Sequence, residues 1–288
     1  MSHAWFLYSL VATVSFAVVG VLFKLPAVKN HNIFVASFWS VFAPLPFALI
    51  FFYRSLVHTD WTMLWISAVW AFFFVIVRFL YLKAYQYADT NLVTPITSTL
   101  GFVGVVLVGV LGFHDYLSSL QMLGIGVAVI TILLLIQSHW RAKQAGYLWL
   151  LLAVISAASV TYKIFQKIGA DSLDIQAFQV YQFAFASLFL FILYGIFHAS
   201  EIKKWPSQLT AGGMFSGSLI GFFSFVGGYA YNLALTKGPF TLINVIHSLY
   251  IIGTIFLGVI IFREKLSKSK VLAIGLAVVS AILIRLGS

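Results

Sequence analysis

A small number of charged and polar side chains interrupt the apolar stretches of this sequence, and they are the first candidates for chemistry. Arg78 follows the apolar run 72–77, and Tyr81 and Tyr85 follow it at i+3 and i+7, which places all three on one face of a helix. A guanidinium can hold a carboxylate or a phosphate in a fixed fork, and phenols add further donors. The spacing therefore predicts an anion-binding face. The alternative is that Arg78 extends its charge to the edge of the apolar region.

A second set of candidates carries ammonium, amide and imidazole groups. Lys163 follows Ser156 and Ser159 at helical spacing, so it can supply a second cationic contact, although it also lies near a helix end. His247 lies three residues after Asn244 and can bond a solute or take part in proton coupling. The alternative for Lys163 is that it extends its charge to the edge of the apolar region. For Asn244 and His247 the alternative is a hydrogen bond between helices without a role in transport.

The remaining candidates are two amides, one indole and one hydroxyl. Gln179 and Gln182 have i+3 spacing. An internal repeat, described below, relates Trp39 approximately to Tyr181 and Ser98 to His247. Amide and aromatic side chains suit the walls of a site for a planar or zwitterionic solute. Packing in the core or against lipid is the alternative for each aromatic residue.

The residues needed for catalysis or for a tightly bound cofactor are missing. The sequence has no cysteine, no His-Glu-x-x-His or Gly-x-Ser-x-Gly motif, and no acidic cluster with metal-ligand spacing. Its connections are also too short to form a soluble catalytic domain. We therefore predict that the protein is not an enzyme and binds neither a cofactor nor a metal. The carbonyl filter or charged ring typical of a channel is not recognisable either.

The elements that must position these residues are membrane-spanning helices. The chain is 62% hydrophobic and 8% charged, with a mean hydropathy of +1.04. Continuous apolar runs of about twenty residues recur along it. We predict an all-α polytopic membrane protein with ten transmembrane helices. Their predicted bounds are 5–23, 33–53, 61–81, 92–113, 120–138, 147–165, 176–197, 212–235, 242–262 and 271–286.

The chain contains an internal repeat. Residues 262–267 align with residues 113–118 without a gap at a shift of 149 positions, and glycines and leucines on both sides match at the same shift. Because five helices per half is an odd number, the second copy enters the membrane from the opposite side, and the repeat is inverted. We predict two five-helix domains, 1–138 and 146–288, with the substrate site between them.

Two local features accompany the repeat. Gly213, Gly217 and Gly221 lie at four-residue spacing, which favours close packing of their helix against a neighbour. Asp115 and Glu264 each precede the last helix of a half. An acid at that position is predicted to cap the helix that follows it.

The net charge of +10 is attributed to basic residues in the connections rather than to a nucleic-acid surface. On one side of the membrane we expect Lys24, Lys29, Arg141, Lys143, Lys203, Lys204, Arg263, Lys265, Lys268 and Lys270. On the side of the termini we expect Arg54, Lys167, Lys237 and Arg285. The rule that basic connections stay in the cytoplasm then places both termini outside it.

With this organisation the chain resembles the drug/metabolite transporter superfamily, in its ten-helix type built from two EamA-like repeats. The resemblance covers nearly the whole chain and is most specific at the end of each repeat. The residues that carry it are Pro95, Asp115, Leu117, Ser118, Gly124 and Gly126, then Glu264, Leu266, Ser267 and Gly275, with Asn244 where a second proline would stand. The resemblance implies a basket of helices around a central cavity, transport by alternating access, and cytoplasmic termini, which is opposite to the orientation that the charges predict.

These observations predict a secondary transporter that moves a small metabolite, either an amino acid or another zwitterionic or anionic solute. The alternative is an exporter of cationic drugs or other hydrophobic compounds. Because carboxylates are missing from the centres of the predicted helices, the first prediction is favoured. The predicted partners are the small-molecule substrate, the lipid bilayer and a coupling proton or ion, but no nucleic acid. We expect a monomer or a homodimer in the bacterial inner membrane.

Overall fold

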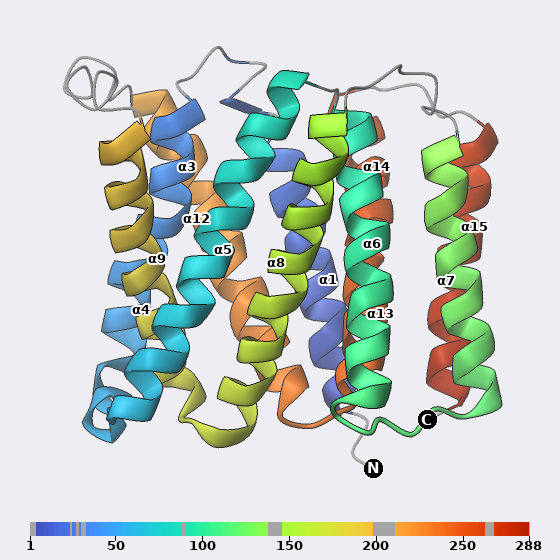
Figure 1. Ribbon diagram of the computed structural model, residues 1–288, viewed down its shortest axis with the longest axis horizontal. Coiled ribbons are helices and arrows are strands. Elements are labelled where there is room, and N and C mark those ends of the chain that lie inside the picture. Colours follow the sequence, from blue (N-terminus) through green and yellow to red (C-terminus); the bar gives the residue numbers. More distant parts are fainter. Residues whose placement is uncertain are drawn as a thin grey trace.

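The computed structural model describes residues 4–23, 25–26, 29, 33–87, 90–137, 146–197, 211–262 and 268–287. Every regular element within these residues is helical (Figure 1). The helices are α1 Ala4–Leu22, α3 Ile33–Phe42, α4 Pro44–Phe52, α5 Trp61–Tyr87, α6 Thr90–Leu111, α7 Ser119–Gln137, α8 Gly146–Ser172, α9 Ile175–Phe197, α12 Ala211–Leu235, α13 Phe240–Ser248, α14 Tyr250–Phe262 and α15 Lys268–Leu286, with the 3-10 helix η1 at Tyr53–His58.

The described helices form ten segments that run between the two ends of one bundle, so the predicted fold class is confirmed. Seven of the segments are long and apolar enough to cross a membrane, and three shorter apolar helices complete the set. The start of α1 and the end of α15 lie at the same end of the bundle (Figure 1). We refer to this end as the terminal end. Helices α7 and α15 pack mainly against each other and stand at one edge (Figure 1).

Two of the ten segments consist of two helices each, where the sequence predicted continuous ones. The second segment is interrupted at Ala43, because Pro44 and Pro46 have no N–H to continue the helical hydrogen bonds. The ninth is interrupted at Leu249, between α13 and α14, without a proline. There the Leu249 N–H donates to the carbonyl of Ile246, a tighter bond than an α-helix makes. By contrast, α6 continues through Pro95.

Helices α7 and α15 lie in the two stretches that the sequence relates by a shift of 149 positions, and they pack against each other. The division into two halves remains a proposal, and the connection 138–145 between them lies outside the described residues.

Helix α12 packs tightly against α3 through the glycines that the sequence singled out. A Cβ atom added to Gly217 would lie 2.6 Å from the Cβ of Trp39 and 2.7 Å from the carbonyl oxygen of Ala36. One added to Gly221 would lie 2.8 Å from the Cδ of Pro44. Such close approach of two helices requires that one of them carries no side chain. The predicted packing role of these two glycines is confirmed.

We predict that Gly217→Ala destabilises the protein. The added methyl group meets backbone atoms that cannot move aside, and overpacking of this kind costs about 1–3 kcal/mol, more than the ~1 kcal/mol gained in helix propensity. The measurement is the apparent melting temperature of the purified protein in detergent. Gly126→Ala is the matched control, because an added Cβ there meets no atom within 4 Å. An unchanged melting temperature for Gly217→Ala would show that α3 and α12 can separate freely.

The carboxylate of Asp115 connects two segments that are far apart in the chain. Its Oδ2 accepts a hydrogen bond of 2.6 Å from the backbone N–H of Thr241, in the first turn of α13. The preceding residue, His114, has a φ of 54°, which turns the chain toward α13. The predicted cap on the following helix is therefore wrong for Asp115, because its partner is α13 and not α7. Glu264 lies outside the described residues.

The start of α7 is capped by a different pair. The N–H of Ser118 donates to Oε1 of Gln121 at 2.8 Å, and the N–H of Gln121 donates to Oγ of Ser118 at 3.3 Å. This reciprocal arrangement is a capping box. It satisfies the first turn of α7 locally, so the carboxylate of Asp115 is left to bind the α13 terminus.

We predict that Asp115→Ala lowers the melting temperature, because it removes the acceptor for the first turn of α13. Loss of an N-terminal cap costs about 0.5–2 kcal/mol. Tyr116→Ala serves as the control, since that neighbouring side chain is 96% exposed. Equal melting temperatures for the two variants would contradict a stabilising role for the Asp115 contact.

Candidate functional site

Arg78 lies inside the bundle. Its Nη1 donates a hydrogen bond to Oγ of Ser40 on α3. The guanidinium carbon lies 5.2 Å from the ring centre of Phe23, just after α1, and 5.0 Å from that of Phe74 on α5. Both distances are in the range of cation–π contacts. Tyr194 on α9 and Tyr162 on α8 are close enough to interact with its charge.

The surroundings of Arg78 come from five segments of the chain, so the side chain faces other helices rather than lipid. Within the described residues no carboxylate pairs with it, and its one hydrogen bond goes to a neutral hydroxyl. The Ser40 hydroxyl in turn donates to the carbonyl of Ser37 at 2.7 Å, which orients its oxygen toward the guanidinium. The remaining guanidinium donors are therefore available to an anion.

The two tyrosines predicted beside Arg78 have different positions. The Tyr81 hydroxyl shares a 2.6 Å hydrogen bond with Oγ1 of Thr97 on α6, and so lies at the contact between α5 and α6. Tyr85 and Ser98 belong to α5 and α6, but their side chains lie outside the described part of the structure. In the structure, the aromatic residues found near the Arg78 guanidinium are Phe23, Phe74, Tyr162 and Tyr194.

Asn244 and His247 lie on α13, next to the interruption at Leu249. Asn244 accepts a 2.7 Å hydrogen bond from the Tyr231 hydroxyl on α12 and donates to the Phe240 carbonyl. The His247 ring contacts the rings of Phe16, Tyr231 and Tyr250 at centroid distances of 4.8, 4.9 and 5.4 Å. Its Nδ1 is buried without a hydrogen-bond partner. The structure thus gathers one imidazole, one amide and two phenols around the end of α13.

Lys163 lies on α8 and is half-buried. It shares a helix face with Ser156 and Gln166, at i−7 and i+3, and both are buried and bonded to neighbouring helices. That face therefore points into the bundle. Lys163 is near enough for its charge to act on the imidazole of His247. By comparison, Lys167 pairs with Asp171 at 2.8 Å, as expected for a charge near the end of a helix.

Gln179 and Gln182 belong to a network of buried amides that joins four helices. Asn232 on α12 donates through Nδ2 to Oε1 of Gln179 at 2.6 Å and to Oε1 of Gln182 at 3.2 Å. Its Oδ1 accepts from Nε2 of Gln166 on α8 at 2.8 Å, and Gln166 accepts from the Trp70 indole of α5 at 3.2 Å. We refer to these five residues as the amide network.

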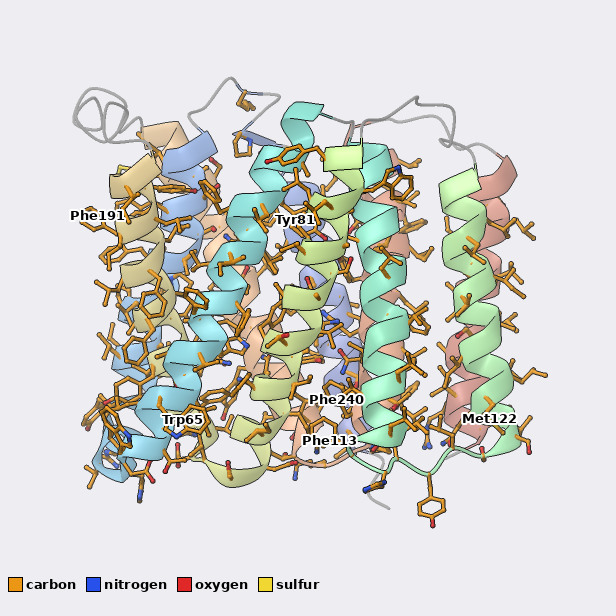
Figure 2. The ribbon with its side chains drawn as sticks, viewed as in Figure 1. Trp65, Tyr81, Phe113, Met122, Phe191 and Phe240 are labelled. Atoms are coloured by element: carbon orange, nitrogen blue, oxygen red, sulfur yellow. The ribbon has the colours of Figure 1, made fainter. Side chains whose placement is uncertain are left out.

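The amide network lies in the interior near the terminal end. All five members are buried, with Asn232 at 0% and Gln182 at 2% exposure. Nearby at that end, the rings of Phe113 and Phe240 lie 4.9 Å apart (Figure 2). Helices α5, α8, α9 and α12 are therefore held together by polar contacts at the end of the bundle that carries the chain termini.

Some members of these clusters were not predicted from the sequence. Tyr162 and Gln166 precede Lys163 and Lys167, and Tyr231 and Asn232 are neighbours, but only their partners on other helices show what they do. A buried amide or phenol in a membrane helix is itself a signal, because it needs a partner. Trp39, which was predicted, lies on α3 with its ring 5.4 Å from that of Phe42, and its Cβ faces Gly217.

We predict that Asn232→Ala destabilises the protein, because it leaves the amides of Gln166, Gln179 and Gln182 without their shared partner. Unsatisfied buried polar groups cost about 1–3 kcal/mol. The melting temperature of the purified protein tests this. Thr236→Ala is the control, since that exposed hydroxyl bonds only to the Leu233 carbonyl one turn away. Similar melting temperatures for both variants would exclude a structural role for the network.

The clusters of described residues supply hydrogen-bond donors and cations. Among the described residues no three His, Asp or Glu side chains come close enough to hold a metal ion. A guanidinium, an ammonium, an imidazole and phenols in a bundle interior can bind and orient an anionic solute.

Comparisons with known proteins agree with this architecture. The model of the EamA-like transporter family matches residues 144–286, close to the bounds of the second predicted half. A solved crystal structure superposes with a TM-score of 0.72 at 15% sequence identity, and the match covers 95% of each chain. At that identity the likeness concerns the fold alone. No curated protein matches the sequence.

Proposed function

We propose that this membrane transporter of the drug/metabolite transporter superfamily carries a small solute with a negatively charged group. Its place in the superfamily follows from the match of residues 144–286 to the EamA-like transporter family. The charged group binds to Arg78. The solute is an anionic metabolite or a zwitterion such as an amino acid, and the carrier works by alternating access. The predicted family resemblance is confirmed by the match, and the solute class and the mechanism are our proposals.

The observation that carries the proposal is the unpaired guanidinium in the bundle interior. An ionised side chain at membrane depth costs about 2.5–3.5 kcal/mol on insertion scales, so its presence is usually tied to function. Arg78 is enclosed by α3, α5, α8 and α9, and within the described residues its hydrogen bond goes to Ser40 and not to a carboxylate. A solute carboxylate or phosphate would supply the missing counter-charge through a paired hydrogen bond.

Alternating access is supported by the interrupted ninth segment. Transporter sites often use discontinuous helices, whose free ends face the solute. The interruption at Leu249 places Asn244 and His247 of α13 beside Tyr250 of α14. In the proposed mechanism the amide network closes the terminal end while the site is open toward the opposite end, and it separates when the helices rearrange.

We predict that Arg78→Ala weakens solute binding. Loss of a charge-assisted hydrogen bond costs about 1.5–3 kcal/mol, which corresponds to about a ten- to hundredfold lower affinity. The measurement is a thermal-shift screen of purified protein with carboxylates, amino acids, phosphate esters and organic cations, followed by uptake into reconstituted vesicles. A bound solute raises the melting temperature of the folded state.

The control for this experiment is Arg54→Ala, which removes an exposed arginine of η1. It should leave the affinity unchanged, whereas Arg78→Lys should retain part of it because a lysine keeps the charge but not the planar fork. Stabilisation by organic cations alone, equal in the wild type and Arg78→Ala, would contradict the proposal and favour export of cationic compounds.

A further inference from the structure

The charges of the chain are distributed unequally between its interior and its ends. The described carboxylate residues Asp60, Asp115, Asp171 and Asp174 lie in connections or in the last turn of a helix. Of the described basic side chains, Arg78 and Lys163 lie more than two helical turns from either end of their helices. The part of the interior that the structure describes thus contains these two cations and no acidic residue.

Lys163 has no partner for its charge in the part of the chain that the structure describes. It forms no ion pair or hydrogen bond there, although it lies on the inward face of α8 between the buried Ser156 and Gln166. The imidazole of His247 is close enough to be affected by the charge of Lys163, and its Nδ1 is also buried without a hydrogen-bond partner among the described residues. Two nitrogen groups that can donate to an anion therefore lie near each other, without a protein acceptor.

We refer to Lys163 and His247 as the second centre. Tyr162 lies near both this centre and Arg78. It precedes Lys163 on α8 and is close enough to interact with the charge of Arg78 and with Tyr250, which stacks on His247. Its ring also contacts Phe74, at a centroid distance of 5.8 Å, and Phe74 carries the cation–π contact to Arg78. The two cationic centres therefore share one aromatic wall.

We propose that the transported solute is a small dianion, with one anionic group bound by Arg78 and the other by Lys163 and His247. This inference rests on the proposed function and narrows its solute class to dicarboxylates or phosphate esters. A solute with two negative groups neutralises both interior cations. A zwitterion would place its own ammonium near one of them, and like charges at short range in a poorly hydrated site repel strongly.

The experiment compares matched ligands on the purified full-length protein. Titration calorimetry measures a four-carbon dicarboxylate, its monoamide, and a phosphate ester of similar length, on the wild type and on Lys163→Gln. We expect the wild type to bind at least one dianion about tenfold or more tightly than the monoamide, because one charge-assisted contact is worth about that factor. The dicarboxylate and the phosphate ester then distinguish the two kinds of dianion.

The variant tests the second centre directly. In Lys163→Gln we expect the preference for the dianion to disappear while the affinity for the monoamide changes by less than about twofold. Lys163→Arg, which keeps a cation, should restore the preference. Lys237→Gln is the control, since Lys237 is exposed in the turn after α12 and should leave all affinities unchanged.

The outcomes for the two proposals can be distinguished. If the wild type binds the dianion and the monoamide equally, or if Lys163→Gln weakens both by the same factor, the dianion inference is overturned. Binding of the monoamide that still depends on Arg78 would then leave the proposed function intact. Binding that depends on neither residue would overturn both.

Discussion

The structure depends on how a membrane bundle accommodates polar groups that lipid cannot satisfy. In hydrocarbon, every polar side chain must find a partner on another helix or pay the cost of desolvation. Most interior polar groups of this chain follow that rule: Asn232 bonds three glutamines, Asn244 bonds Tyr231, and Ser156 bonds the backbone of α6. Arg78 and Lys163 are the charged exceptions, because neither has a carboxylate partner among the described residues. In the proposed function an anionic solute supplies the missing counter-charge.

Sequence patterns were sufficient for features that depend on one helix at a time. Hydropathy located the ten segments, and the spacing of Gly217 and Gly221 identified a close helix contact, because both signals are local. The interruption at Leu249 was not predictable in this way, since it contains no proline and is visible only in the tighter backbone bond from Leu249 to Ile246. Asp115 shows the same limit. Its position suited a cap on α7, but Ser118 and Gln121 already satisfy α7, and the acceptor binds a helix 126 positions away.

The sequence predicted individual residues of the candidate site better than it predicted which of them lie next to each other. Arg78, Lys163, Asn244 and His247 were identified because a charge or amide in an apolar run is rare. Helical spacing suggested that Tyr81 lies beside Arg78. Instead, Tyr81 bonds Thr97 on α6, whereas Arg78 bonds Ser40 on α3. Asn232 and Gln166 were missed because a buried amide acquires a role only from partners on other helices, which one sequence does not reveal.

One face of α5 connects Arg78 to the amide network. Trp70, Phe74 and Arg78 follow each other at four-residue intervals, the first ring stacked on the second and the second under the guanidinium. Trp70 belongs to the amide network, about 12 Å along the helix from Arg78 at the usual rise per residue. The same helix face therefore carries both the residue proposed to bind the solute and a member of the network that joins α5 to α8, α9 and α12. Binding and helix packing are thus in contact through three successive turns of α5.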